Sequence, residues 1–125
     1  MTDSSPVDLF GPDWWDKVLA AWNASGCRHS LGGFGLSSFR VSDMDVERIW
    51  VYWDAEGNAS RESAGATDVP TFSASRRDWL DFIDGRFTAT AGVLRRRLHL
   101  EGSFRQVLPY TKAFNNLARV ARPFV

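Results

Sequence analysis

The sequence predicts an α+β fold, with a single, mainly antiparallel sheet of about five strands and helices packed on one face. Two observations lead to it. Short segments whose apolar residues alternate with period two, as in strands, recur along the chain, and the clearest runs from Val46 to Trp53. Three longer segments, beginning at Pro12, Ser75 and Ser103, instead repeat apolar residues every three to four positions, as amphipathic helices do.

Length and composition favour one folded domain with a substantial core. The chain has 125 residues, of which 44% are hydrophobic, with six Trp and nine Phe, and its formal net charge is zero. This composition argues against disorder and against nucleic-acid binding through bulk charge. We expect residues 1–11, which are polar and contain Pro6, to form a flexible N-terminus, and residues 12–125 to form the single domain.

One cysteine and two histidines limit the available chemistry. Cys27 has no cysteine partner, and its spacing from His29 and His99 does not match a metal site, so we expect no metal and no cofactor. The absence of a long apolar run and of a secretory signal predicts a cytoplasmic protein. Thirteen Arg against two Lys, with many Ala and Gly, suggests a GC-rich bacterial source.

The neutral total hides two halves of opposite charge. Residues 1–75 hold five basic and eleven acidic side chains, whereas residues 76–125 hold ten basic and four acidic side chains. If the halves form separate faces, the basic face attracts an anionic partner. If they interleave in the fold, the charges pair with one another, and both interpretations are open from sequence alone.

The first helix is predicted to begin at Pro12 and to end at residues 23–26. Its apolar residues Trp15, Val18, Leu19 and Trp22 fall on one stripe, which is typical of a core-facing helix. Residues 27–29 are then expected on a strand, where the Cys27 thiol and the His29 imidazole face the same side. That pattern leaves two interpretations open. Cys27 is either a nucleophile with His29 as its base, or an inert cysteine beside a solvated histidine.

Three strands are expected next, at residues 31–41, 46–53 and 59–62, with a turn at 56–58. In the second strand, Ile49, Val51 and Trp53 face one side of the sheet. Trp50 and Tyr52 face the other side, together with Arg48. Because both faces carry large apolar groups, each needs a cover, a cavity or a partner chain.

The segment 69–114 organises the second half of the chain. A strand at 69–74, which Asp68 leads, runs into a capping box, Ser75-Arg-Arg-Asp, that opens a helix ending at Gly85. A hinge of small residues at 88–92 and a strand at 97–101 follow. A second capping box at Ser103 opens a closing amphipathic helix that reaches about Arg119.

This order of elements resembles the sterol carrier protein type 2 domain, as a stand-alone bacterial member. The resemblance rests on the Trp79-Leu-x-x-Ile-x-Gly-Arg helix, the hinge, the strand Leu-His-Leu-Glu-Gly ending at Gly102 and the closing helix. The family hinge usually reads Asn-Pro-x-x-Ala-Phe-x-x-Gly-Lys-Leu-x-x-x-Gly-Asp. This chain has Ala89 at the Pro, Gly92-Val93 at the Ala-Phe, Arg96 at the first Gly and Ser103 at the Asp. A glycine at position 96 marks a bulge or a positive φ, which Arg reaches only with strain.

The resemblance implies a tunnel between the sheet and the helices that binds fatty acyl chains, sterols or other long apolar molecules. The residues assigned to ligand binding are Trp50, Tyr52, Trp79, Phe82, Ile83, Phe87, Val93, Leu94, Leu98, Leu100, Leu108, Phe114 and Leu117. Arg95 and Arg96 are candidates for holding a negatively charged head group at the mouth of the tunnel. The alternative is that they belong to a run of charged side chains that is simply solvated. An ordinary filled core predicts the same apolar residues.

We therefore expect a non-catalytic, lipid-binding protein that carries an acyl chain, an isoprenoid or a polyketide-like intermediate. The candidate partners are an acyl carrier and a partner enzyme. We expect the protein not to bind nucleic acid and to make at most peripheral contact with a membrane. One alternative is a cyclase or isomerase that acts in the same cavity through Tyr52, Tyr110 or His29. Another is a scaffold that associates through its sheet, for example as a homodimer, with Trp50, Tyr52 and Trp53 at the interface.

Overall fold

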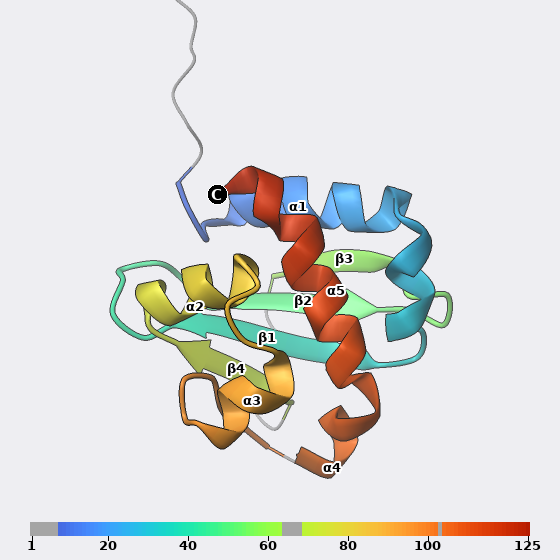
Figure 1. Cartoon of the computed structure of the whole chain (residues 1–125). Helices are drawn as coiled ribbons and strands as arrows, with labels where there is room; N and C mark the ends of the chain where they lie inside the picture. Colours follow the sequence, from blue (N-terminus) through green and yellow to red (C-terminus); the bar gives the residue numbers. More distant parts are fainter. Residues whose placement is uncertain (1–7, 64–68, 103) are drawn as a thin grey trace, which may run out of the picture.

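The computed structural model describes residues 8–63, 69–102 and 104–125. In this part of the chain, five strands form one sheet in the order β3-β2-β1-β4-β5, and the helices pack on one face of it (Figure 1). The strands are β1 (Gly35–Val41), β2 (Ile49–Trp53), β3 (Ala59–Glu62), β4 (Thr71–Ala74) and β5 (His99–Glu101). The predicted α+β class, with a mainly antiparallel sheet and helices on one face, is confirmed.

Strands β1, β2 and β3 form the antiparallel meander that the sequence predicts. The chain then crosses to the other side of β1, where β4 runs parallel to it and β5 pairs antiparallel with β4. This crossover places Phe39 of β1 beside Phe72 of β4, and their rings stack with centroids 5.6 Å apart. The centre of the sheet therefore presents aromatic rings to the helices.

Helix α1 (Pro12–Ala24) spans the predicted residues and buries the predicted stripe. Its C-terminal end is attached to β3 by hydrogen bonds. Asn23 accepts from the Ala59 N–H at 2.6 Å and donates to the Ala59 carbonyl at 2.9 Å. The indole of Trp22 donates to the Gly57 carbonyl at 2.8 Å. These bonds hold α1 across one half of the sheet.

Helix α2 (Arg76–Ile83) begins where the capping box predicts. The Ser75 hydroxyl accepts a hydrogen bond from the Asp78 N–H at 3.1 Å, which satisfies one of the free donors of the first turn. Trp79 lies on the buried side of α2, and its indole donates to the Arg40 carbonyl on β1 at 2.7 Å. Helix α2 is therefore held over the half of the sheet that α1 leaves uncovered.

Four local predictions need correction. Residues 27–29 lie in a 3₁₀ helix, η1 (Gly26–Leu31), and β2 begins at Ile49 instead of Val46. The small-residue hinge is a short helix, α3 (Ala89–Leu94), capped by Thr88, whose hydroxyl accepts from the Ala91 N–H at 3.2 Å. The closing helix is divided into α4 (Phe104–Val107), η2 (Leu108–Tyr110) and α5 (Thr111–Ala121), with a last turn, η3 (Arg122–Phe124).

The division of the closing helix follows from Pro109, which has no N–H to donate and disfavours a helical conformation in the residue before it. The predicted lead residue Asp68 and the predicted cap at Ser103 lie outside the described residues, as do residues 1–7 of the N-terminal segment. Phe10, which the sequence-based boundary assigns to that flexible segment, has its side chain buried at 4% exposure.

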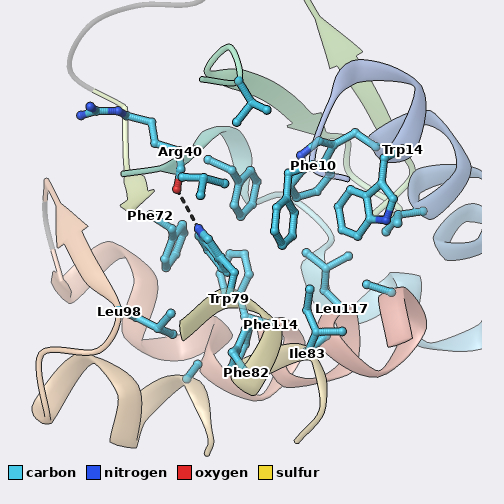
Figure 2. A pocket seen from close by; sticks show the side chains of 18 of the residues that line it. Phe10, Trp14, Arg40, Phe72, Trp79, Phe82, Ile83, Leu98, Phe114 and Leu117 are labelled. Carbon is cyan, nitrogen blue, oxygen red and sulfur yellow. Dashed lines mark hydrogen bonds between the residues drawn. The ribbon is translucent and has the colours of Figure 1, made fainter. Parts of the chain in front are cut away.

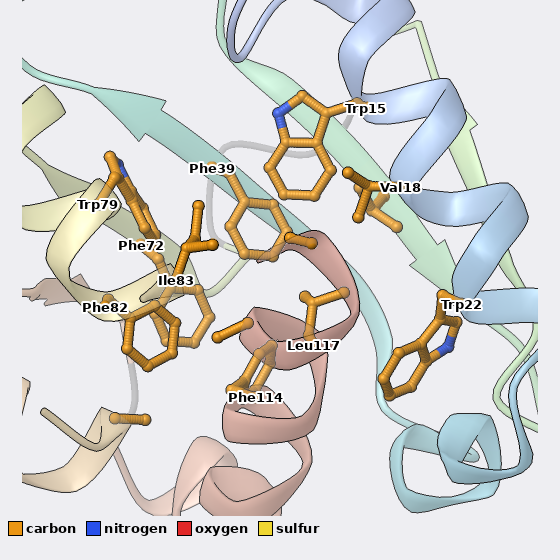
Figure 3. Packing of buried hydrophobic residues seen from close by; sticks show 14 of the residues in the cluster. Trp15, Val18, Trp22, Phe39, Phe72, Trp79, Phe82, Ile83, Phe114 and Leu117 are labelled. Carbon is orange, nitrogen blue, oxygen red and sulfur yellow. The ribbon is translucent and has the colours of Figure 1, made fainter. Parts of the chain in front are cut away.

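The core lies between the inner face of the sheet and helices α1, α2 and α5 (Figure 3). Helix α5 crosses in front of the sheet between the other two (Figure 1). Its Phe114 contacts Phe72 of β4, with ring centroids 4.7 Å apart, and Leu117 is buried beside it. The sheet and three helices thus share one aromatic core, and this core surrounds the candidate site.

Candidate ligand-binding cavity

A cavity of about 50 Å³ lies inside this core, between the sheet and helices α1, α2 and α5 (Figure 2). Aromatic and aliphatic side chains form most of its wall. The wall consists of Phe10, Trp14, Trp15, Val18, Phe39, Arg40, Val41, Val46, Glu47, Phe72, Trp79, Phe82, Ile83, Ala89, Leu98, Phe114, Leu117, Ala118 and Ala121. The site is therefore continuous with the core and is built by residues far apart in the sequence.

The polar atoms of the wall tryptophans Trp79 and Trp14 are already paired with backbone groups. The Trp79 indole donates to the Arg40 carbonyl at 2.7 Å, and the Trp14 indole donates to the Phe124 carbonyl at 2.9 Å. Arg40 and Glu47 are the charged residues of the wall, and both lie at its β1–β2 end. A ligand in this cavity would contact mainly carbon, so burial of apolar surface would supply its binding energy.

The cavity is small compared with the molecules that the sequence resemblance implies. Pockets for drug-sized ligands enclose about 300–1,000 Å³. A dry apolar cavity that binds a single benzene ring has a volume of about 150 Å³. The described conformation is therefore nearly filled, and a long apolar ligand would enter only after wall side chains have moved.

Phe10 is the wall residue with the most unusual backbone. It lies in the turn before α1 and adopts φ of 65°, in the left-handed region that a bulky side chain rarely occupies. Its ring nevertheless faces the cavity and meets Trp14 edge to face at 5.0 Å. A conformation of this kind costs about 1–3 kcal/mol, so Phe10 is the part of the wall whose native position is held against local strain.

Six of the residues assigned to ligand binding lie together on this wall: Trp79, Phe82, Ile83, Leu98, Phe114 and Leu117. Phe87 is buried just behind it, with its ring 5.8 Å from that of Phe82. Val93 and Leu100 are partly buried against the same core. The C-terminal part of the assignment thus converges on one place in the fold.

Four other assigned residues lie neither on the wall nor in the core behind it, which corrects the sequence-based assignment. Trp50 and Tyr52 face the opposite side of the sheet, because the inward positions of β2 belong to Ile49, Val51 and Trp53. Leu94, at the end of α3, is 74% exposed, and Leu108, in the turn around Pro109, is 51% exposed. Arg95 and Arg96 are exposed and do not line the cavity, so neither is placed where a head group would sit.

The assignment also missed the half of the wall that α1, β1 and the turn before α1 provide. The helical spacing of Trp15 and Val18 marks them as core residues, but a core residue and a wall residue follow the same pattern. Trp14 lies beside that stripe and is not singled out by it. Phe10 gives no periodic signal, because it precedes the helix.

The outer face of the sheet is partly covered by Arg48. Its guanidinium lies over the Trp50 ring at 4.2 Å and donates to the hydroxyls of Ser38 at 2.6 Å and Thr71 at 2.8 Å. This contact explains why Ser38 and Thr71 are buried although the helices pack on the other face. On β2, the large side chain that stays exposed to solvent is Tyr52, at 45% exposure.

An ion-pair cluster fastens the wall at α2. Arg97, just before β5, contacts Asp78 at 2.7 Å and Asp81 at 2.6 Å, and its guanidinium lies 4.4 Å from the centre of the Phe87 ring. The hydrogen bond from Arg97, together with its charge, lowers the pKa of Asp81 below its ordinary value. The cluster ties α2 to the chain between α3 and β5, next to Leu98 of the wall.

Arg96 ends α3 in a conformation that usually requires glycine. Its φ is 60°, its N–H donates to the Val93 carbonyl at 3.2 Å, and the Arg97 N–H donates to the Gly92 carbonyl at 2.8 Å. These two bonds define a Schellman motif with Arg96 at the left-handed position. Of the two possibilities that the sequence left open at this position, a bulge and a positive φ, the structure has the positive φ.

Cys27 and His29 are not arranged as a nucleophile and its base. They lie two positions apart on η1, where residues advance by about a third of a turn and therefore point in different directions. The Cys27 sulfur is 3.2 Å from the Ser25 hydroxyl. Within the described ranges, no group of three or more His, Cys, Asp and Glu residues could hold a metal ion, and no helix is long and apolar enough to span a membrane.

No model of a known protein family and no curated protein matches this chain. Solved structures do. A crystal structure of sterol carrier protein 2 aligns at 22% identity over 92% of this chain and 98% of its own, with a TM-score of 0.72. The solution structure of a conserved hypothetical protein from Thermus thermophilus, described as possibly a sterol carrier protein, aligns at 22% identity over 99% and 94%, with a TM-score of 0.69.

A third structure, UbiJ-SCP2, a ubiquinone synthesis protein, aligns at 18% identity over 85% of this chain and 90% of its own, with a TM-score of 0.59. The three alignments cover 85–99% of this chain, and their TM-scores of 0.59–0.72 show a common fold. The order of helices and strands read from the sequence points to the same fold. The chain has the fold of sterol carrier protein 2 domains.

Proposed function

We propose that this protein binds an apolar or amphipathic small molecule, such as an acyl chain, an isoprenoid or a polyketide-like intermediate, between its sheet and helices, without chemical conversion. One observation carries the proposal: the cavity is walled by aromatic and aliphatic carbon from the sheet and from helices α1, α2, α3 and α5, while the indoles of Trp14 and Trp79 bond to backbone carbonyls. A wall of this kind favours apolar surface and imposes little orientation on it.

The names of the structural neighbours also support the binding of an apolar molecule. One is a sterol carrier protein, and another is a ubiquinone synthesis protein. A carrier that serves a biosynthetic enzyme needs to hold an apolar intermediate and pass it on. We therefore extend the proposal to a partner enzyme or an acyl carrier that supplies or receives the ligand.

The residues that the enzyme alternative requires do not gather at the cavity. Tyr52 lies on the outer face of β2, and His29 lies on η1. Tyr110 is partly buried and meets the Phe34 ring at 4.9 Å, away from the cavity wall. General acid–base catalysis needs a group within hydrogen-bond reach of the substrate, so binding accounts for this site better than turnover does.

Ligand entry requires the cavity to widen, and Phe10 is the wall residue best suited to move. Its left-handed backbone is relieved when the turn before α1 rearranges, which offsets part of the cost of withdrawing the ring. A benzyl group withdrawn from a cavity of about 50 Å³ leaves space of the size that accepts an aromatic ring. We therefore assign Phe10 the role of a displaceable wall in the proposed site.

The test is a binding titration followed by tryptophan fluorescence, because Trp14, Trp15 and Trp79 line the cavity. The probes are a long-chain fatty acid, a long-chain isoprenol and a four-ring aromatic polyketide, with native mass spectrometry to confirm stoichiometry. Ala121→Leu adds bulk to the wall and should weaken binding about tenfold or more, since overpacking costs about 1–3 kcal/mol. Phe10→Ala enlarges the cavity and should strengthen binding.

Ala20→Leu is the matched control, because Ala20 is exposed on α1 and the substitution adds the same atoms outside the cavity. Thermal unfolding of each variant separates lost binding from lost folding. A wild-type protein that binds none of the three probes contradicts the proposal. Equal affinity in Ala121→Leu, Phe10→Ala and wild type places any bound ligand outside this cavity.

A further inference from the structure

Three large apolar side chains are exposed at one end of the molecule. Leu94, at the end of α3, is 74% exposed, Leu108, in η2, is 51% exposed, and Phe104, in α4, is 37% exposed. In Figure 1, α3, β5 and α4 lie at the end of the molecule opposite α1 and the C-terminus. We call these three residues, with the cations around them, the α3–α4 surface.

Four exposed cations lie within four positions of these side chains in the sequence: Arg95, Arg96, Arg105 and Lys112. None of the four takes part in an ion pair within the described parts of the chain, whereas Arg61, Arg86 and Arg97 are all paired with aspartates. The pairs formed by Arg61, Arg86 and Arg97 each join residues from the same half of the sequence. Glu101, the remaining acidic residue of the second half, contacts Arg40 at 3.7 Å. The acidic side chains of residues 76–125 are thus engaged by other arginines and not by the four cations of this surface.

The position of Arg96 gives a second, independent indication. It holds the left-handed position of a Schellman motif, where glycine is the residue that fits without strain. The chain therefore keeps a strained cation on an exposed turn, between the protruding Leu94 and the wall residue Leu98. Strain retained at an exposed charged residue suggests a role outside folding.

We infer that the α3–α4 surface docks on a lipid bilayer that contains anionic head groups. The cations match the negative surface of such a bilayer, and each Lys or Arg near it adds about a fivefold gain in affinity. Leu94 protrudes from the end of α3 and Leu108 protrudes from η2, as needed to enter the interfacial layer of the bilayer. A protein partner would have to supply pockets that fit these side chains, whereas a bilayer accommodates them without fitted pockets.

The docking surface is separate from the proposed ligand site. Its residues do not line the cavity, and its cations do not contact the wall tryptophans. Vesicle binding can therefore be measured without any apolar ligand, and a failure to dock leaves the ligand proposal standing. Equally, a protein that binds no apolar ligand can still dock through this surface.

The experiment is co-sedimentation with vesicles of phosphatidylcholine alone and of phosphatidylcholine mixed with phosphatidylglycerol, at low and high salt. We expect binding to the mixed vesicles only, with loss at high salt. The double variant Arg95→Gln and Arg96→Gln should weaken this binding about 30-fold. Leu94→Ser combined with Leu108→Ser should also weaken this binding. The binding that remains should depend more strongly on salt than that of the wild type.

The matched control is Lys17→Gln combined with Arg119→Gln, which removes the same charge from exposed positions on α1 and in the last turn of α5. This control should bind as wild type does, because α1 and the C-terminal end of α5 lie at the end of the molecule opposite the α3–α4 surface (Figure 1). Three results each overturn the inference: no sedimentation with the mixed vesicles, equal loss in the control and in the Arg95 and Arg96 double variant, or capture of an acidic protein without any vesicle binding. Circular dichroism of each variant confirms that it is folded.

Discussion

Replacing Arg96 with glycine should make the protein more stable, although it removes a charged side chain and adds no contact. Arg96 has φ of 60° at the end of α3, where the N–H groups of residues 96 and 97 close the helix on the carbonyls of Val93 and Gly92. A left-handed conformation costs a non-glycine residue about 1–2 kcal/mol. Glycine adopts it freely and keeps both hydrogen bonds.

The gain is partly offset because glycine loses more conformational freedom on folding, by about 0.5–1 kcal/mol. The net stabilisation expected for Arg96→Gly is therefore about 0.5–1 kcal/mol. For a domain of 125 residues, this corresponds to a rise in Tm of roughly 2–4 °C. Urea denaturation should show a higher midpoint with an unchanged slope, since the surface exposed on unfolding stays the same.

Two controls separate backbone strain from charge. Arg96→Ala removes the charge but keeps the left-handed requirement, so it should leave stability close to that of wild type. Arg95→Gly changes the neighbouring residue, whose φ is −91°, and should lose about 0.5–1 kcal/mol from chain entropy alone. If Arg96→Gly is no more stable than Arg96→Ala, the strain assigned to this residue is absent and the reasoning fails.

Two further predictions concern α2. Ser75→Ala removes the acceptor for the Asp78 N–H and should destabilise the protein by about 1 kcal/mol; an unchanged urea midpoint would show that the cap is dispensable. Asp81 has a lowered pKa in the folded state because of its hydrogen bond from Arg97, so the folded state binds this proton more weakly than the unfolded state. Its contribution to stability is therefore complete above the ordinary aspartate pKa of about 4 and is lost as the pH falls through the lowered pKa. Arg97→Gln should flatten that part of the stability profile, and a profile unchanged below pH ~4 would rule out the linkage.

Local chemistry predicted the regular elements well. The stripe of α1 and the cap of α2 follow from side-chain spacing and from one hydroxyl, so they need no long-range information. Alternation in β2 correctly separated Trp50 and Tyr52 from the inward positions. It could not tell which face the helices cover, and this is why those two residues were assigned to the wrong side of the sheet.

The errors have identifiable causes. The segment that forms α3 consists of small residues without an apolar stripe, and its helical signal is limited to the cap at Thr88. In the closing helix, the spacing of Val107, Phe114 and Leu117 favours one continuous helix, but Pro109 interrupts it because proline has no N–H to donate. The cavity lay beyond prediction for another reason: whether packed rings leave a space depends on volumes contributed by distant segments.

The closed wall at Phe10 has a consequence for the rate of ligand exchange. If ligand enters only in molecules whose Phe10 ring has left the core, the measured affinity falls in proportion to the fraction of such molecules. The same closure slows departure, because a bound molecule leaves only when the turn before α1 opens again. Under the proposed function, a carrier built in this way retains its cargo through many collisions with solvent and releases it when a partner stabilises the open turn. The residence time of the cargo would then be set by one strained residue.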